Sequence, residues 1–241
     1  MYHWYAWYKV VHPIASGCIR VSWSVETQRA RRHTRAMGTL DKYKASTAVG
    51  EPLGNPDGKS SNQFMMDWYK TEPRGVVAKP QQQVLAEFFT SMLVLSAEFK
   101  YEPTIGVANY LYFVRDRWQL SLISPEEWNE ERREGFIGTC VLQPDMTWTI
   151  EPAKHLKDNE RLAHAIGRFW HAFDETLDTE QTLEDILPFY VRHMPYYQRL
   201  HAAGLGRSIR AAVTLGDQRS IKARDWRLSL PGVDRVLAIS G

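Results

Sequence analysis

The sequence predicts an α+β protein: a small antiparallel β-meander packed with helices and followed by an α-helical carboxy-terminal region. Apolar residues first recur at helical spacing, then alternate along short segments, and then return to helical spacing. The chain of 241 residues is long enough for one large domain, and its 44% hydrophobic content excludes a disordered protein. The expected divisions are an extension, an α+β domain, a helical region packed on it and a basic, loosely ordered tail, at residues 1–36, 37–151, 152–206 and 207–241.

A core helix is expected over residues 82–99. Apolar side chains recur there every three or four positions, and Pro103 follows the run. Upstream, residues 48–58 are rich in Gly, Pro, Asn and Asp, which predicts a loop.

Alternating residues between 109 and 122 predict a β-hairpin with a turn at 115–117. If Val114 pairs with Trp118, one face of the hairpin is the core side and Phe113 points the other way. The expected core side chains are Tyr110, Tyr112, Val114, Trp118, Leu120 and Leu122.

Two further strands complete the expected sheet. Ser124, Pro125 and Glu127 have the spacing of a capping box that opens a short helix. Strands at 136–142 and 147–150 then flank a turn, with Phe136, Cys140 and Leu142 on the core side.

Beyond the sheet, residues 157–178 carry an apolar helical stripe opposite a stripe with His164 and His171. Thr182 and Asp185 predict a capping box for another helix through Tyr190, which Pro188 must kink or end. A further helix over 196–203 is expected to end at the glycines of 204–206.

The amino-terminal 36 residues hold six basic residues against one acidic residue and lack periodicity. We expect an unstructured or non-native extension before a start at Met37, with a basic nucleic-acid-binding arm as the alternative. The sequence contains neither a signal-peptide pattern nor an apolar run long enough to cross a membrane. With only two cysteines, we expect free thiols and a cytoplasmic protein.

The middle of the chain resembles an uncharacterised family, domain of unknown function 2452, which has members in bacteria and animals. The resemblance covers about residues 54–151 and rests on a tyrosine-rich hairpin followed directly by Ser124-Pro125-Glu126-Glu127-Trp128. It supports the sheet and implies no activity, cofactor or catalytic residue.

Candidate chemical motifs are weak. The Gly54–Ser60 turn resembles a phosphate-binding loop but has three residues between its glycines where four are needed. His164, His171 and Asp174 are spread over nearly three helical turns, so we expect no metal site and no cofactor. Cys140 is expected to be a buried, inert thiol, and no catalytic residue is assigned.

The sequence therefore favours a non-enzymatic binding or adaptor protein, with a hydrolase or transferase assembled only in the fold as the alternative. Stacking on Phe113 with arginine support suggests single-stranded nucleic acid, but the glutamates of 126–134 would repel phosphate. We expect neither a nucleic-acid nor a membrane partner and leave a protein as the candidate. The candidate binding residues are Phe113, Arg115, Arg117, Trp118, Trp128, Arg132 and Arg133.

Overall fold

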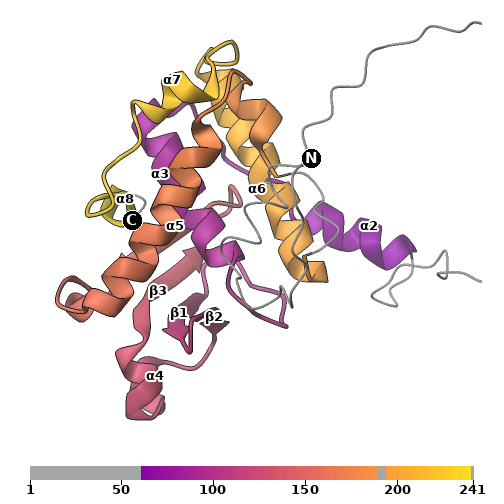
Figure 1. Ribbon diagram of the computed structural model, residues 1–241. Coiled ribbons are helices and arrows are strands. Elements are labelled where there is room, and N and C mark those ends of the chain that lie inside the picture. Colours follow the sequence, from indigo (N-terminus) through magenta and orange to yellow (C-terminus); the bar gives the residue numbers. More distant parts are fainter. Residues whose placement is uncertain (1–60, 189–193, 240–241) are drawn as a thin grey trace, which may run out of the picture.

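The computed structural model describes residues 61–188 and 194–239 (Figure 1). The segment 1–36, the start at Met37, the loop over 48–58 and the turn at 54–60 lie outside these residues. The α-helices are α2 (Ser61–Lys70), α3 (Gln81–Leu95), α4 (Glu130–Glu134), α5 (Glu160–Leu177), α6 (Tyr196–Leu215), α7 (Ala223–Arg227) and α8 (Val236–Ile239). The strands are β1 (Ala108–Val114), β2 (Arg117–Ser121), β3 (Phe136–Leu142) and β4 (Trp148–Pro152). Short 3-10 helices are η2 (Pro125–Glu127), η3 (Lys154–Lys157) and η4 (Leu183–Ile186).

The α+β fold class is confirmed, with a four-stranded antiparallel sheet followed by a helical carboxy-terminal region. The strand order is β2-β1-β3-β4, so one connection departs from a simple meander. The chain leaves β2 at the sheet edge, passes through η2 and α4, and returns beside β1 as β3. Both expected capping boxes are present, at Ser124 with Glu127 and at Thr182 with Asp185, although each opens a 3-10 helix. The second helix ends at Ile186, two residues before Pro188, the residue expected to kink or end it.

The predicted register of the first hairpin is wrong by one residue. Arg117 belongs to β2 and pairs with Val114, so Trp118 lies opposite Phe113. The two-residue turn works because Arg115 and Asp116 both adopt positive φ angles, 51° and 58°, which matches the twist of the strands. Because side chains alternate, the shift exchanges the two faces of β1 and buries Phe113 in the core, whereas Trp118 and Leu120 of β2 are buried as predicted. Leu122, also expected in the core, lies beyond the end of β2 and is 55% exposed.

The predicted core-facing orientation of Phe136 is also wrong, because β3 contains a β-bulge. Leu111 pairs with Gly138 and Tyr112 with Phe136, so Ile137 is the extra residue in β3. Cys140 and Leu142 remain on the core face, as predicted. Phe136 lies beyond the bulge, and its ring instead contacts the rings of Tyr110 and Tyr112 on the outer face.

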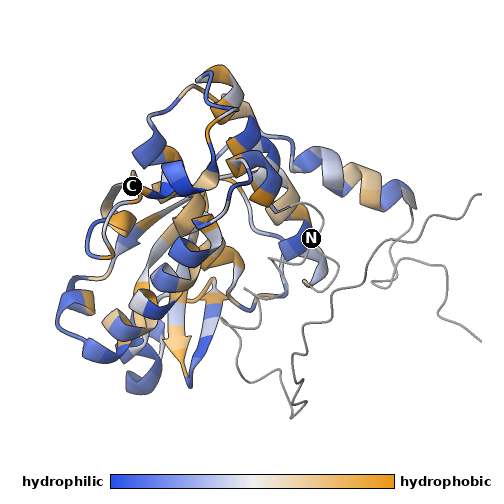
Figure 2. Cartoon of the chain, turned by 45° about the horizontal axis from the view of Figure 1, so that its top comes forward, coloured by the Kyte–Doolittle hydropathy of each residue, from blue (hydrophilic) through white to orange (hydrophobic). Residues whose placement is uncertain are grey.

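The core lies between the inner face of the sheet and the helices. The expected helix over 82–99 is α3, which ends at Leu95 and is buried along most of its length. Phe89 of α3 meets Phe169 and Phe173 of α5 edge-on, with ring centroids 5.4 and 5.5 Å apart. In Figure 2 the helices carry both hydrophilic and hydrophobic residues, as expected for helices that turn one side to a core.

Helix α6 does not end at its glycines, contrary to the prediction. It continues through Gly204 and Gly206 to Leu215, because these glycines allow close packing. A Cβ atom at Gly204 would lie 2.9 Å from the Thr71 carbonyl oxygen, and one at Gly206 would collide with the Pro188 carbonyl oxygen. In a single sequence, a glycine that ends a helix cannot be distinguished from a glycine that lets two backbones approach closely.

Residues 207–239 are not a loosely packed tail. They complete α6 and then form α7 and α8, and Trp226, Val236 and Leu237 join the core. Arg227 of α7 donates two hydrogen bonds of 2.6 Å to the Asp174 carboxylate of α5. Figure 1 shows α7 at the end of the molecule opposite α4. The basic residues of this segment therefore contribute to helix docking.

Helix α2 was not anticipated from the sequence. Arg207 of α6 holds its carboxy-terminal end: the guanidinium donates to the Thr71 carbonyl oxygen at 2.7 Å and stacks over the Trp68 ring at 4.6 Å. Tyr196 donates a 2.8 Å hydrogen bond to the buried Asp67 carboxylate. Within the described ranges, no helix combines the length and hydrophobicity that crossing a bilayer requires.

Candidate functional site

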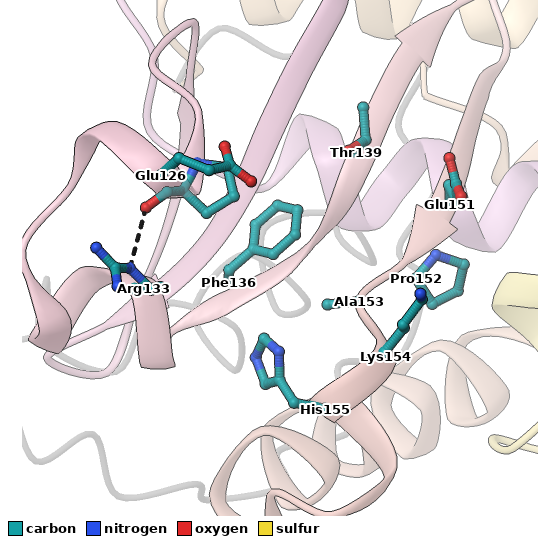
Figure 3. Close-up of a pocket in the computed structure, with 10 residues that line it drawn as sticks. Glu126, Arg133, Phe136, Thr139, Glu151, Pro152, Ala153, Lys154 and His155 are labelled. Carbon is teal, nitrogen blue, oxygen red and sulfur yellow. Dashed lines mark hydrogen bonds between the residues drawn. The ribbon is translucent and has the colours of Figure 1, made fainter.

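The candidate site is a hollow of about 590 Å³ on the outer face of the sheet. One wall is the insertion between β2 and β3, and the other is the chain that leaves β4 (Figure 3). A second hollow of about 570 Å³ adjoins it, since Arg133 and His155 line both. The first is lined by Pro125, Glu126, Arg133, Phe136, Thr139, Glu151, Pro152, Ala153, Lys154 and His155. The second is lined by Arg133, Glu134, His155, Asp158, Asn159 and Glu160.

Phe136 forms the apolar floor of the first hollow, and Figure 3 shows its ring at the centre. Its ring centroid lies 5.5 Å from that of Tyr112 and 6.2 Å from that of Tyr110. Tyr112 is buried beneath the insertion, where its hydroxyl donates a 2.8 Å hydrogen bond to the Ile123 carbonyl oxygen. Burial raises the pKa of the Tyr112 phenol, so this group stays neutral and acts structurally.

The insertion positions Arg133 without neutralising it. Asn129 caps α4 by accepting a hydrogen bond from the Arg132 backbone N–H. From α4, Arg133 donates to the carbonyl oxygens of Pro125 at 3.4 Å and Trp128 at 3.1 Å. Both partners are uncharged, so the guanidinium keeps its positive charge available for a ligand.

The opposite wall carries Glu151, Lys154 and His155, all exposed. The centroids of the His155 and Phe136 rings lie 6.4 Å apart. Neither Lys154 nor His155 forms an ion pair with any residue of the described ranges. This wall therefore adds an unpaired ammonium group, an imidazole and an unpaired carboxylate to the apolar floor.

The charges are segregated along the two hollows. Glu151 lies opposite Thr139 in the β3–β4 ladder, whereas Lys154 and His155 follow the strand and lie near the level of Phe136. In Figure 3, Glu126 and Glu151 lie on opposite walls in the upper part of the view, and Arg133 and His155 lie below them. The second hollow then adds the carboxylates of Glu134, Asp158 and Glu160 beyond Arg133 and His155. The order along the surface is acidic, basic, acidic.

Two of the seven candidate binding residues cannot contact a ligand. Phe113 and Trp118 are each only 3% exposed and belong to the core. Trp118 lies on the expected core side, and the one-residue register shift turns Phe113 to the same side, so stacking of a base on Phe113 is ruled out. Arg115 is paired with Glu131 at 3.0 Å, and Arg117 lies 3.7 Å from Glu98, both at the exposed end of the hairpin.

The other three candidates lie in the insertion. Arg132 stacks over the half-buried Trp128 ring at 3.9 Å, which leaves Arg133 as the candidate that lines the hollows. Sequence reasoning missed Phe136, Lys154 and His155. The bulge hid Phe136, but the polar or charged residues that follow the predicted strand 147–150, at 151, 154, 155 and 157, were a usable signal for a surface wall.

The alternative enzymatic candidates do not converge. His164 and His171 are exposed on the water-facing side of α5, and Asp174 is engaged by Arg227. The Cys140 thiol is fully buried, and burial raises its pKa, which opposes thiolate formation. Among residues 61–188 and 194–239, no three potential ligand side chains gather with the geometry of a metal site.

Comparison with known proteins adds a family match and no activity. Residues 78–171 match the family model described as "Protein of unknown function (DUF2452)", which confirms the resemblance seen in the sequence. The match runs from the start of α3 into α5, so it includes every residue that lines the two hollows. No curated protein and no solved structure matches the chain significantly.

Proposed function

We propose that this protein is a non-enzymatic binding or adaptor module that contacts a protein partner through the outer face of its sheet. The observation that carries the proposal is the first hollow, in which an apolar floor at Phe136 lies among charged side chains that have no ion-pair partner in the described ranges. Protein-binding surfaces commonly combine an apolar centre with a polar rim. Some other exposed charges are paired, as in Arg115 with Glu131 and Lys222 with Glu180.

A binding role is favoured over catalysis by the openness of the site. Enzyme sites usually enclose their reacting groups in a cleft or cavity. Glu151, Lys154 and His155 are instead exposed side chains on one wall of a surface hollow. No pair of them is placed as a nucleophile and its base.

A protein partner is favoured over nucleic acid by charge. The two hollows together present five carboxylates, from Glu126, Glu134, Glu151, Asp158 and Glu160, against the cations of Arg133 and Lys154. Phosphate groups would be repelled by this excess of negative charge. We further propose a cytoplasmic location, which is supported by the free thiol of Cys140.

Photo-crosslinking in cells tests the proposal. A benzophenone amino acid at Thr139, which lines the first hollow, should give a discrete protein adduct. The same amino acid at Lys157, which lines neither hollow, is the matched control and should give no such adduct. Equal labelling from both positions would contradict a binding role for this face. Turnover of an ester or phosphate substrate that is abolished by His155→Ala would favour the enzymatic alternative.

A further inference from the structure

The two hollows form one surface whose charge order selects its ligand. We infer that it binds an extended, net-basic peptide segment of a partner protein, in which an acidic residue is flanked on both sides by basic residues. The inference rests on the proposed function and adds the chemistry of the partner. Its basis is the order acidic, basic, acidic along adjoining hollows that share Arg133 and His155.

The central position would receive the acidic residue. Arg133 is fixed by two carbonyl oxygens, which leaves the outer part of its guanidinium without a carboxylate partner. Lys154 on the opposite wall makes no ion pair with a described residue. A carboxylate that enters between the two walls would be attracted by both cations and could form a charge-assisted contact with one of them, and the next apolar side chain could cover Phe136.

The flanking positions would receive the basic residues. On one side lie Glu126 and Glu151, and on the other lie Glu134, Asp158 and Glu160. These carboxylates also lack ion-pair partners in the described part of the chain. The excess of acidic over basic groups means that a complementary ligand must carry net positive charge.

The sheet geometry sets the spacing. Thr139, opposite Glu151, pairs with Tyr110, and Phe136, near the level of Lys154 and His155, pairs with Tyr112. Because of the bulge at Ile137, the two levels are two strand residues apart, which is roughly 7 Å. An extended peptide rises by roughly 3.3 Å per residue, so its acidic residue and the first flanking basic residue should be about two positions apart.

Peptide display against the full-length protein tests this order. Random twelve-residue peptides should enrich sequences that are net basic and carry one acidic residue between basic ones. Lys154→Glu should lower the affinity for the enriched peptides by about three- to tenfold, because the attraction between Lys154 and the acidic residue of the peptide becomes a repulsion. Lys157→Glu makes the same charge change in the same 3-10 helix outside both hollows and should leave binding unchanged.

A charge exchange gives the decisive result. Replacing the acidic residue of an enriched peptide by lysine should restore binding to the Lys154→Glu protein and weaken binding to the wild type. A different outcome is that the enriched peptides lack the acidic residue and still fail to bind the Glu151→Lys and Phe136→Ala variants. That result would overturn the charge order and leave the proposed binding face intact. Peptides that are indifferent to all of these substitutions would overturn both proposals.

Discussion

Phe113 and Trp118 lie directly opposite each other across the β1–β2 hairpin, with ring centroids 4.7 Å apart. The Trp118 ring also meets Phe169 of α5 at 6.2 Å, nearly edge-on. The pair therefore joins the edge of the sheet to the helical layer. Aromatic contacts of this kind add to the free energy already gained from burying the rings.

Replacing Trp118 with alanine should lower the free energy of unfolding by about 3–5 kcal/mol, because a buried indole is removed from the core. Urea denaturation followed by circular dichroism measures the change. Arg117→Ala, at the exposed neighbouring position, is the control and should change stability by less than about 0.5 kcal/mol. Equal effects of the two substitutions would contradict the burial of Trp118 in the core.

Two glycines should respond in opposite directions to alanine. At Gly204 of α6 a Cβ atom would press against the Thr71 carbonyl, so Gly204→Ala should cost about 1–3 kcal/mol. Gly167 of α5 has open space at the same position, so Gly167→Ala should stabilise the protein by about 0.5–1 kcal/mol. Thermal denaturation of both variants tests the pair, and stabilisation by Gly204→Ala would exclude the close helix contact.

Trp226 should prove essential to stability even though it lies near the carboxy terminus. Its side chain is fully buried, so Trp226→Ala should cost about 3–5 kcal/mol. Leu228, two residues later, is 88% exposed, and Leu228→Ala should have almost no effect. A loss of less than about 1 kcal/mol at Trp226 would instead support a loosely packed tail.

Lys79 joins two carboxylates in a largely buried ionic cluster. Its ammonium group donates to Glu87 at 2.7 Å and to Asp145 at 2.9 Å, linking α3 to the β3–β4 turn. Desolvation lowers the pKa of Lys79, but the hydrogen bonds to Glu87 and Asp145 raise it by more. The pKa of Lys79 therefore lies above its ordinary value. Lys79→Met should cost about 3–5 kcal/mol at neutral pH, because it leaves two buried carboxylates without a cation. Chemical denaturation of Lys79→Met measures this loss, and a change below about 1 kcal/mol would contradict it.

The pH dependence of this cluster has a definite sign. Desolvation raises the pKa of Asp145, but hydrogen bonds from Thr147 and Lys79 lower it by more, so the folded-state pKa is depressed. A depressed carboxyl pKa stabilises the fold above the ordinary value of about 3.9, and this stabilisation is lost as the pH falls through the folded-state value. The stability difference between the wild type and Asp145→Asn should therefore be constant near neutral pH and shrink below about pH 4. Denaturation at a series of pH values measures it, and a difference that grows toward acid pH would contradict the assignment.

The elements of the fold were largely predictable because they depend on local periodicity and capping. The helix α3, the strand β3 at 136–142 and both capping boxes follow from the spacing of residues near one another in the chain. The family resemblance also came from such a local pattern, and the match over 78–171 includes it.

The site was much less predictable, because faces depend on register. A turn of two residues in place of three moved Phe113 into the core, and one bulge residue turned Phe136 outward. Alternation has a period of two, so a single residue exchanges the two faces, and composition alone does not reveal the exchange. Arg133 was identified, but its companions on the opposite wall were not.

The sequence by itself determined the fold class, the strands and the apolar stripes, since these require only that each segment bury one side. Tertiary structure alone decided that α6 runs through its glycines, that Trp226 completes the core, and that Arg133, Phe136 and Lys154 meet on one surface. Each of these depends on which distant segment lies alongside. Such pairings are fixed by the packing of the whole chain, and no local pattern of residues specifies them.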